Sequence, residues 1–274
     1  DEVGTTHDKI VIENSNQGLK REYEGVLLQG HFQIGHFTVG GNYTWSRLWG
    51  NVESETAGQG SVAILNPAAY YPEYSAFANN APMGYLNGDE RNHANVWLAF
   101  DVPTSFGRFN ASLLQTYHSG RRYSAQTTLD LRSAVKNPGY LTPPTLSTRY
   151  FFSPRGGLQV DDITSTGLAL NWARRFGHFE GFIESDILNL FNEDGIESAS
   201  NLNTTVNVSR TDRNLAVFNP RTTVPKECPQ GVKTTDASCR GIANYQLSST
   251  FGQPISKDAY QQPRTFRISL GVRF

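Results

Sequence analysis

Three carboxylates give the first hint of chemistry in this sequence. Glu180, Glu184 and Asp186 all occupy even-numbered positions of one segment. Carboxylates on one face of a strand can act as general acid and base, or can bind a cation. Polar residues at alternate positions are also the default where a strand borders water inside a barrel. We favour this second interpretation and predict neither catalysis nor a metal site from these carboxylates.

Histidines and candidate nucleophiles give no clearer signal. His31, His93 and His118 lie in separate segments, without the short spacing that metal ligands usually share. No Ser, His and Asp residues stand together as a catalytic group, although such a group can also assemble from distant strands. We therefore predict no enzyme activity, no metal and no cofactor, and keep a hydrolase embedded in a barrel as an alternative.

Aromatic and arginine side chains in the long connecting segments are better candidates for ligand capture. These residue types provide large contact areas and planar hydrogen bonding, so they dominate recognition surfaces. Packing among the loops themselves, or contact with lipopolysaccharide, explains them equally well. The predicted ligand-binding residues are Trp49, Tyr70, Tyr71, Tyr74, Arg121, Arg122 and Tyr123.

The final segment, Gln261 to Phe274, has the clearest strand pattern. Its apolar and polar residues alternate, so the two sets point to opposite faces of a strand. One face holds Phe266, Ile268, Leu270, Val272 and Phe274, and the other holds Thr265, Arg267, Ser269, Gly271 and Arg273. Such a strand separates lipid from an aqueous interior, or a protein core from solvent.

The same alternation recurs upstream in three hairpins, each formed by two strands and a tight turn. The hairpins lie within residues 18–46, 94–118 and 167–187, with turns at Gly35, at Pro103 to Gly107 and at Arg174 to Gly177. A further short strand is predicted around Ile10 and Ile12. The aromatic residues that suit a membrane interface are Tyr43, Trp45, Tyr117 and Phe179.

The connections alternate between tight turns and long segments. The long segments are Trp49–Arg91, Ser119–Leu158 and Asn192–Gln262. Long loops on one side and short turns on the other are typical of outer-membrane barrels. A β-sandwich has no reason to separate its loops in this way. The sequence therefore predicts an all-β fold, an antiparallel transmembrane β-barrel.

Composition agrees with this fold. Aromatic residues make up 12% of the 274 residues and Met occurs once, which suits strands joined by turns. No apolar run approaches the roughly 20 residues of a membrane-spanning helix. The net charge of −1 gives no reason to expect a nucleic-acid partner.

Cys228 and Cys239 lie in a stretch without histidines, which favours a disulfide over a metal site and implies an oxidising compartment.

Several motifs resemble the C-terminal part of TonB-dependent outer-membrane receptors. The segment Asp186–Asn192 (DILNLFN) resembles the Asn-Leu-Phe segment that ends the penultimate strand in that family, and QQPRTFRISLGVRF resembles its closing strand. The Oar-like branch is most similar, through Phe218-Asn219-Pro220, Pro225, Phe251-Gly252 and Tyr260–Arg264.

The resemblance implies that residues 1–274 are the C-terminal portion of one barrel domain. This portion would supply about seven or eight of about 22 strands in the outer membrane of a Gram-negative cell. Because the sequence begins Asp1-Glu2-Val3 without Met, we expect a mature product or a piece of a longer protein. The sequence contains no TonB box and no plug domain, so we expect the remaining strands of the receptor to lie elsewhere. The closing-strand residues Phe266, Ile268, Leu270, Val272 and Phe274 would form the insertion signal.

The function implied by the resemblance is uptake of a solute of unknown identity at the cell surface. The implied partners are membrane lipid, lipopolysaccharide, the barrel-insertion machinery, and TonB acting through a plug outside this chain. Two other functions stay open: a structural or adhesive barrel without transport, and the barrel-embedded hydrolase. The alternative for the fold is a complete small barrel of eight strands, whose interior side chains would fill.

Overall fold

A single antiparallel sheet dominates the computed structural model, which describes residues 20–51, 82–130, 147–220 and 222–274. Its strand order is β1-β2-β4-β5-β10-β11-β14, and the short β3 also pairs with β2. The long strands are β1 (Arg21–Ile34), β2 (Phe37–Gly50), β4 (Asn92–Thr104), β5 (Gly107–His118), β10 (Ile163–Phe176), β11 (Phe179–Leu188) and β14 (Thr265–Arg273). The expected all-β antiparallel fold is thus confirmed, whereas the strand predicted around Ile10 and Ile12 lies outside the described residues.

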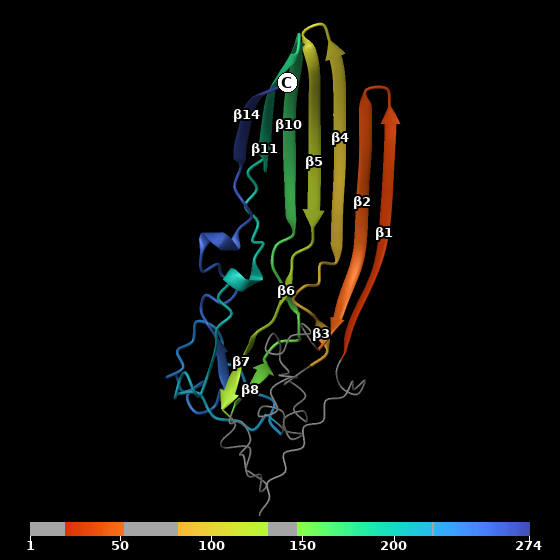
Figure 1. Cartoon of the computed structure of the whole chain (residues 1–274). Coiled ribbons are helices and arrows are strands. Elements are labelled where there is room, and N and C mark those ends of the chain that lie inside the picture. Colours follow the sequence, from red (N-terminus) through yellow and green to blue (C-terminus); the bar gives the residue numbers. More distant parts are fainter. Residues whose placement is uncertain (1–19, 52–81, 131–146, 221) are drawn as a thin grey trace, which may run out of the picture.

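The three hairpins close through tight turns at one end of the sheet (Figure 1). Gly35 and Gly177 each hold the first position of a two-residue turn, with φ of 59° and 63°. Glycine adopts this positive φ without strain, and such turns match the twist of the flanking strands. The strands run further than the sequence suggested, so Pro103 lies within β4 and Arg174 within β10.

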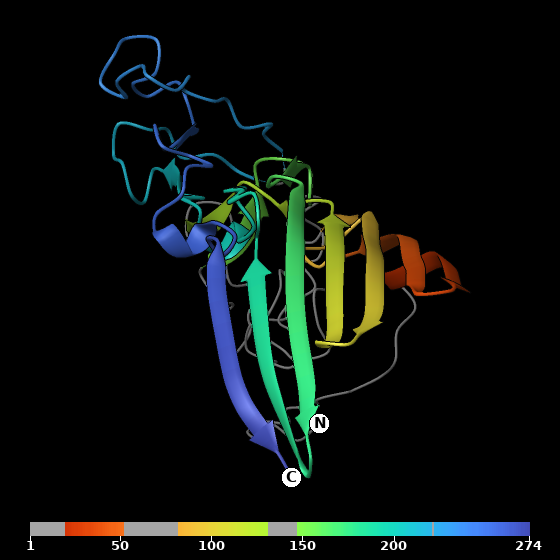
Figure 2. The same cartoon turned by 90° about the horizontal axis from the view of Figure 1, so that it is seen from above.

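The sheet is open at both edges. β1 pairs with β2 and β14 pairs with β11, and no pairing within the described residues joins β1 to β14. Figure 2 shows β1 and β2 turned well away from the direction of β11 and β14, so the sheet is strongly twisted. The described strands therefore do not close into a small eight-stranded barrel.

One face of the sheet is apolar and uncovered. Because the registers are regular, apolar side chains line up in rows that cross all seven long strands. One such row consists of Phe32, Val39, Leu98, Leu113, Leu168, Ile187 and Phe266. Phe32 and Phe266 are 68% and 64% exposed at the two edges. This surface is called the apolar face below.

The opposite face is polar and carries hydrogen bonds between neighbouring strands. Asn171 donates to the Asn110 side chain (3.2 Å), and Asn110 donates in turn to Asp101 (3.0 Å). A smaller pair further along the strands joins Asn95 to Asn42 (3.1 Å). This surface is called the polar face below.

Most of the buried residues lie in the long connections, although Ser46, Ile163 and Thr166 are buried within β2 and β10. These segments, residues 82–91, 119–130, 147–162, 189–220 and 222–264, gather at one end of the sheet (Figure 1) and are called the loop cap. Their elements are β3 (Gly84–Tyr85), β6 (Arg122–Tyr123), β7 (Gln126–Asp130), β8 (Ser147–Phe151), β9 (Leu158–Gln159), β12 (Val206–Val208), β13 (Tyr245–Leu247) and the 3₁₀ turns η2 (Ala199–Asn201) and η3 (Lys257–Ala259). Parts of the predicted long connections thus form short strand pairs and pack together.

Two small hydrophobic clusters stabilise the loop cap. Leu129, Tyr150 and Val208 form the first, with aromatic neighbours that include Phe218. The second surrounds the disulfide between Cys228 and Cys239, whose Cα atoms lie 5.3 Å apart. Both cysteines are fully buried, and the bridge closes a loop too polar to build a large core. Among the described residues, no helix is both long and apolar enough to span a membrane.

Candidate functional site

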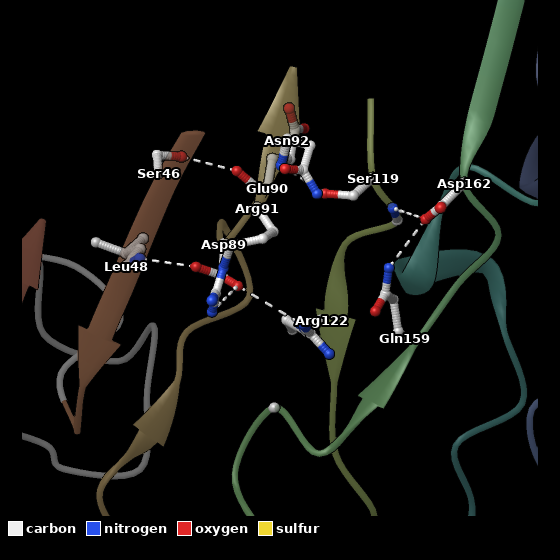
Figure 3. Close-up of polar contacts among 12 residues, drawn as sticks. Ser46, Leu48, Asp89, Glu90, Arg91, Asn92, Ser119, Arg122, Gln159 and Asp162 are labelled. Carbon is white, nitrogen blue, oxygen red and sulfur yellow. Dashed lines mark hydrogen bonds and ion pairs between the residues drawn. The ribbon is translucent and has the colours of Figure 1, made fainter. Parts of the chain in front are cut away.

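A fully buried aspartate connects three separate parts of the chain at the base of the loop cap. Asp89 accepts a hydrogen bond of 2.7 Å from the backbone N–H of Leu48, at the end of β2. Its other oxygen lies 3.4 Å from Nε of Arg122 and 3.8 Å from Nη2 of Arg91. Figure 3 shows these contacts converging on the Asp89 carboxylate. A buried carboxylate is stable only when charges and donors surround it in this way.

The two arginines are also held by an aromatic ring. The guanidinium carbons of Arg91 and Arg122 each lie 4.9 Å from the centroid of the Tyr85 ring. Arg91 also lies 5.7 Å from the ring of Trp45. Stacking on aromatic rings and pairing with Asp89 together restrict the guanidinium groups to one geometry. Arg91 and Arg122 therefore serve chiefly as structural parts of the loop cap.

The next residue extends this network toward solvent. Glu90 accepts a hydrogen bond of 2.9 Å from Nε of Arg121 on its side chain. Its backbone carbonyl accepts one of 2.7 Å from the hydroxyl of Ser46. The Arg121 side chain is 53% exposed, compared with 20% for Arg122. Arg121 is thus the more exposed of these two arginines.

A cleft of about 410 Å³ opens beside Arg121. Three parts of the loop cap line it: the turn before β4, the β6–β7 segment, and the segment around η2. Its polar lining consists of Asn87, Glu90, Arg121, Arg122, Tyr123, Ser124, Gln126, Ser198, Ser200 and Thr204. Hydroxyls, amides and charged groups of both signs suit a polar ligand rich in hydrogen-bonding groups.

The wall of the cleft around η2 is fixed by hydrogen bonds to the returning chain. The Asn203 amide donates to the hydroxyls of Ser248 (3.0 Å) and Thr250 (2.7 Å). Asn201 donates to the carbonyl of Asp258 (2.9 Å). These contacts join the two ends of the connection between β11 and β14, so they hold this wall of the cleft in place.

Tyr123 is the aromatic residue of the cleft lining. Its ring lies 6.4 Å from the ring of Phe251, measured between centroids. Burial raises the pKa of the Tyr123 hydroxyl above its ordinary value of 10.0. The hydroxyl therefore stays protonated near neutral pH and can donate to a ligand oxygen.

The structure brings together only some of the predicted ligand-binding residues. Arg121, Arg122 and Tyr123 line the cleft side by side. Trp49 instead is the last residue but one of β2, with its ring edge-on to Tyr85 at 4.9 Å, and is not among the residues that line the cleft. Tyr70, Tyr71 and Tyr74 lie outside the described residues.

Several groups that shape the cleft could not be predicted from the sequence. Asp89 and Glu90 carry no signal beyond a turn-forming Asn87-Gly88 pair ahead of them. Ser198 and Thr204 lie far along the chain, and nothing in their local sequence indicates where that segment folds back. Asn87-Gly88 could have predicted the turn, but not the two arginines that meet it.

The acidic and histidine residues of the strands form no second site. Glu180 and Glu184 both lie 3.4 Å from the guanidinium of Arg273, so two of the three carboxylates are paired on the polar face. His93 and His118 are cross-strand neighbours with ring centroids 6.3 Å apart. Among the described residues, no group of three or more potential ligands is placed to hold a metal.

The closing strand carries the predicted insertion signal on the apolar face of an edge strand. Ile268 and Leu270 are 71% and 73% exposed, and the Phe274 ring meets that of Phe179 at 6.1 Å in an edge-on contact. The sheet presents these side chains to its surroundings, with no second layer over them in the described chain.

No protein family model, curated protein or solved structure matches the sequence or the fold.

Proposed function

We propose that this chain forms part of the wall and the outer loops of a TonB-dependent outer-membrane receptor of the Oar-like branch, which takes up a solute. The observation that carries the proposal is the division of one sheet into an uncovered apolar face and a hydrogen-bonded polar face, with all long loops at one end. Lipid on one side and an aqueous interior on the other would satisfy both faces.

The height of the apolar face supports a membrane setting. Tyr43 and Tyr117 lie at its loop end, and Phe109 and Phe179 lie at its turn end. The eight steps from Phe109 to Tyr117 correspond to about 26 Å along β5. A strand tilt of about 40° shortens this to about 20 Å, comparable with the apolar band of outer-membrane barrels.

The open edges support a larger barrel. β1 and β14 each leave one row of backbone groups without a strand partner among the described residues. Unpaired backbone groups are costly in lipid, because nothing there can hydrogen-bond to them. Further strands of a barrel of about 22 would pair with both edges.

Capture would begin in the cleft of the loop cap, which faces the cell exterior in this orientation. Solute bound beside Arg121 and Tyr123 would stand above the polar face. TonB, acting on a plug outside these residues, would supply the energy for passage. Lipopolysaccharide would surround the loop end, and the Phe274 strand would direct insertion of the barrel.

Transport can be tested without knowing the solute. Three strains are compared: wild type, a deletion of this receptor, and a deletion of TonB. Compounds in spent medium are measured by mass spectrometry. Transport predicts compounds that the wild type depletes and that both deletion strains leave behind. An adhesive barrel predicts no such compounds. A hydrolase predicts products that depend on this protein but not on TonB.

The role of the cleft has its own test. Arg121→Ala and Tyr123→Ala should slow depletion of the same compounds, because both side chains line the cleft without holding Asp89. Arg149→Ala is the matched control, since Arg149 is an exposed loop-cap arginine outside the cleft lining. Equal depletion by the Arg121→Ala variant and the wild type would assign capture to another part of the loops.

A further inference from the structure

The apolar face is not smooth but contains a hollow of about 660 Å³ across β4, β5, β10 and β11. Its walls are the apolar side chains Phe100, Val102, Phe109, Leu170, Trp172 and Ile183. These residues occupy two neighbouring rows of the sheet, at the end that carries the tight turns. The hollow thus lies on the opposite half of the sheet from the cleft and the loop cap.

The hollow arises from two small residues among large ones. Ala111 lies between Phe100 and Leu170 in the register, and Ser185 lies beyond Leu170 in the same row. Both contribute to the lining, and neither fills the space that its neighbours leave. Asn110 and Asn171 also border it, but their side chains bond to each other on the polar face. An apolar chain would therefore meet almost only carbon in this hollow.

A cation stands at the end of the hollow nearest the turns. Arg174 follows Trp172 by two residues, so it lies on the same face about 7 Å further along β10. Its guanidinium lies 5.2 Å from the Phe176 ring, and no ion pair joins it to a carboxylate in the described chain. Arg273, on the polar face, is paired with two carboxylates. Arg174 thus differs in having a cationic head that remains available beside an apolar hollow.

We propose that this hollow is a binding site for a glycerophospholipid, with one acyl chain over Ala111 and the phosphate on Arg174. The inference rests on the proposed membrane setting. There, the turn end faces the inner leaflet of the outer membrane, and Arg174 reaches the depth of the headgroups. A guanidinium binds phosphate oxygens through two parallel hydrogen bonds, which an uncharged apolar partner could not use. The combination of hollow and cation favours a lipid over a second copy of the sheet.

The test uses the full-length protein, purified from outer membranes in detergent and mixed with phosphatidylglycerol. Native mass spectrometry then measures the fraction of protein that retains one lipid. Ala111→Phe fills the hollow and should lower retention about tenfold. Ala94→Phe is the matched control. It makes the same substitution on the apolar face, but in β4 and outside the hollow, and should leave lipid retention unchanged.

A second pair of variants tests the headgroup contact and covers the case in which Ala111→Phe fails to fold. Arg174→Gln should lower retention of phosphatidylglycerol, whereas Arg175→Gln, on the polar face of the same strand, should not. Equal retention by wild type and Arg174→Gln would overturn the proposal, as would equal losses in both members of either pair. A protein absent from the outer membrane would overturn the proposed function itself, while a membrane protein without lipid retention would overturn only the lipid site.

Discussion

Asp89 is the residue on which the geometry of the loop cap depends most directly. Replacing it by alanine removes the acceptor for the Leu48 N–H and leaves Arg91 and Arg122 without their carboxylate. We expect a loss of about 2–4 kcal/mol in local stability, below the upper range for buried pairs because the side chains of Arg91 and Arg122 are still 25% and 20% exposed. Hydrogen exchange of residues 84–91 and 121–124 measures this loss.

The control for Asp89→Ala is Glu24→Ala. Glu24 forms an exposed pair of 3.9 Å with Arg47, and its loss should change stability by less than about 1 kcal/mol. Unchanged exchange near Asp89 in the Asp89→Ala variant would mean that the aromatic stacking alone holds the arginines.

Asp212 makes the loop cap sensitive to acid. The Thr234 hydroxyl (2.6 Å), followed by the Asn214 backbone N–H (2.9 Å), donates to its carboxylate and lowers its pKa below the ordinary 3.8. A carboxylate whose pKa is lower when folded stabilises the folded state above its unfolded pKa. This contribution should be complete above about pH 4 and should disappear as pH falls through the lowered pKa.

The comparison of wild type with Asp212→Asn tests this pH dependence. The difference in unfolding midpoint should be constant from about pH 5 to 7 and should narrow below about pH 4. A difference that stays constant down to about pH 2 would show that Asp212 acts by its shape and not by its charge.

At the scale of elements, the segment Asn189–Asn192 (Asn-Leu-Phe-Asn) after β11 acts as a clamp. Its side chains hold together the two ends of the connection between β11 and β14. Asn189 is buried with φ of 51°, and its amide donates to the carbonyls of Glu193 (2.8 Å) and Gln262 (2.9 Å). Asn192 accepts from the backbone N–H of Arg264 (3.0 Å). The Asn-Leu-Phe-Asn motif therefore has a structural role in this chain, because its two asparagines bond to the segment that leads into β14.

Asn189→Ala should destabilise this clamp by about 2–4 kcal/mol, since it removes side-chain hydrogen bonds and places alanine at a positive φ. Asn189→Gly removes the same bonds without the backbone strain and should lose less. Urea unfolding in lipid bilayers compares the two. Equal losses would mean that the backbone conformation contributes nothing measurable.

The closing strand gives a test of which face meets lipid. Leu270→Arg should destabilise the protein by about 2–4 kcal/mol if Leu270 lies at mid-bilayer. Ser269→Arg is the matched control, because Ser269 lies opposite Glu184 on the polar face and an arginine there gains a carboxylate neighbour. Unfolding measurements that find Leu270→Arg harmless would place the apolar face outside lipid.

At the scale of the whole molecule, the sheet could be predicted from the sequence and the loop cap could not. Two-residue alternation is a local property, so Phe266, Ile268 and Leu270 already define a face before any contact is known. The cleft depends instead on contacts such as that between Asp89 and Arg122, which are 33 residues apart and have no periodic signature. Arg121 and Tyr123 were predicted as ligand contacts because their residue types suit recognition. Ser198 and Thr204 could not be predicted, because their positions depend on the fold of the whole connection between β11 and β14.

The two-residue turns at Gly35 and Gly177 have a consequence for how this protein can change during evolution. Each turn fixes the register of its hairpin, and a shift of one residue would exchange the apolar and polar faces of a strand. Strands can therefore lengthen or shorten only by two residues at a time. The irregular segments of the loop cap have no such alternation between two faces, so insertions of any length can accumulate there while the two faces of the sheet stay the same.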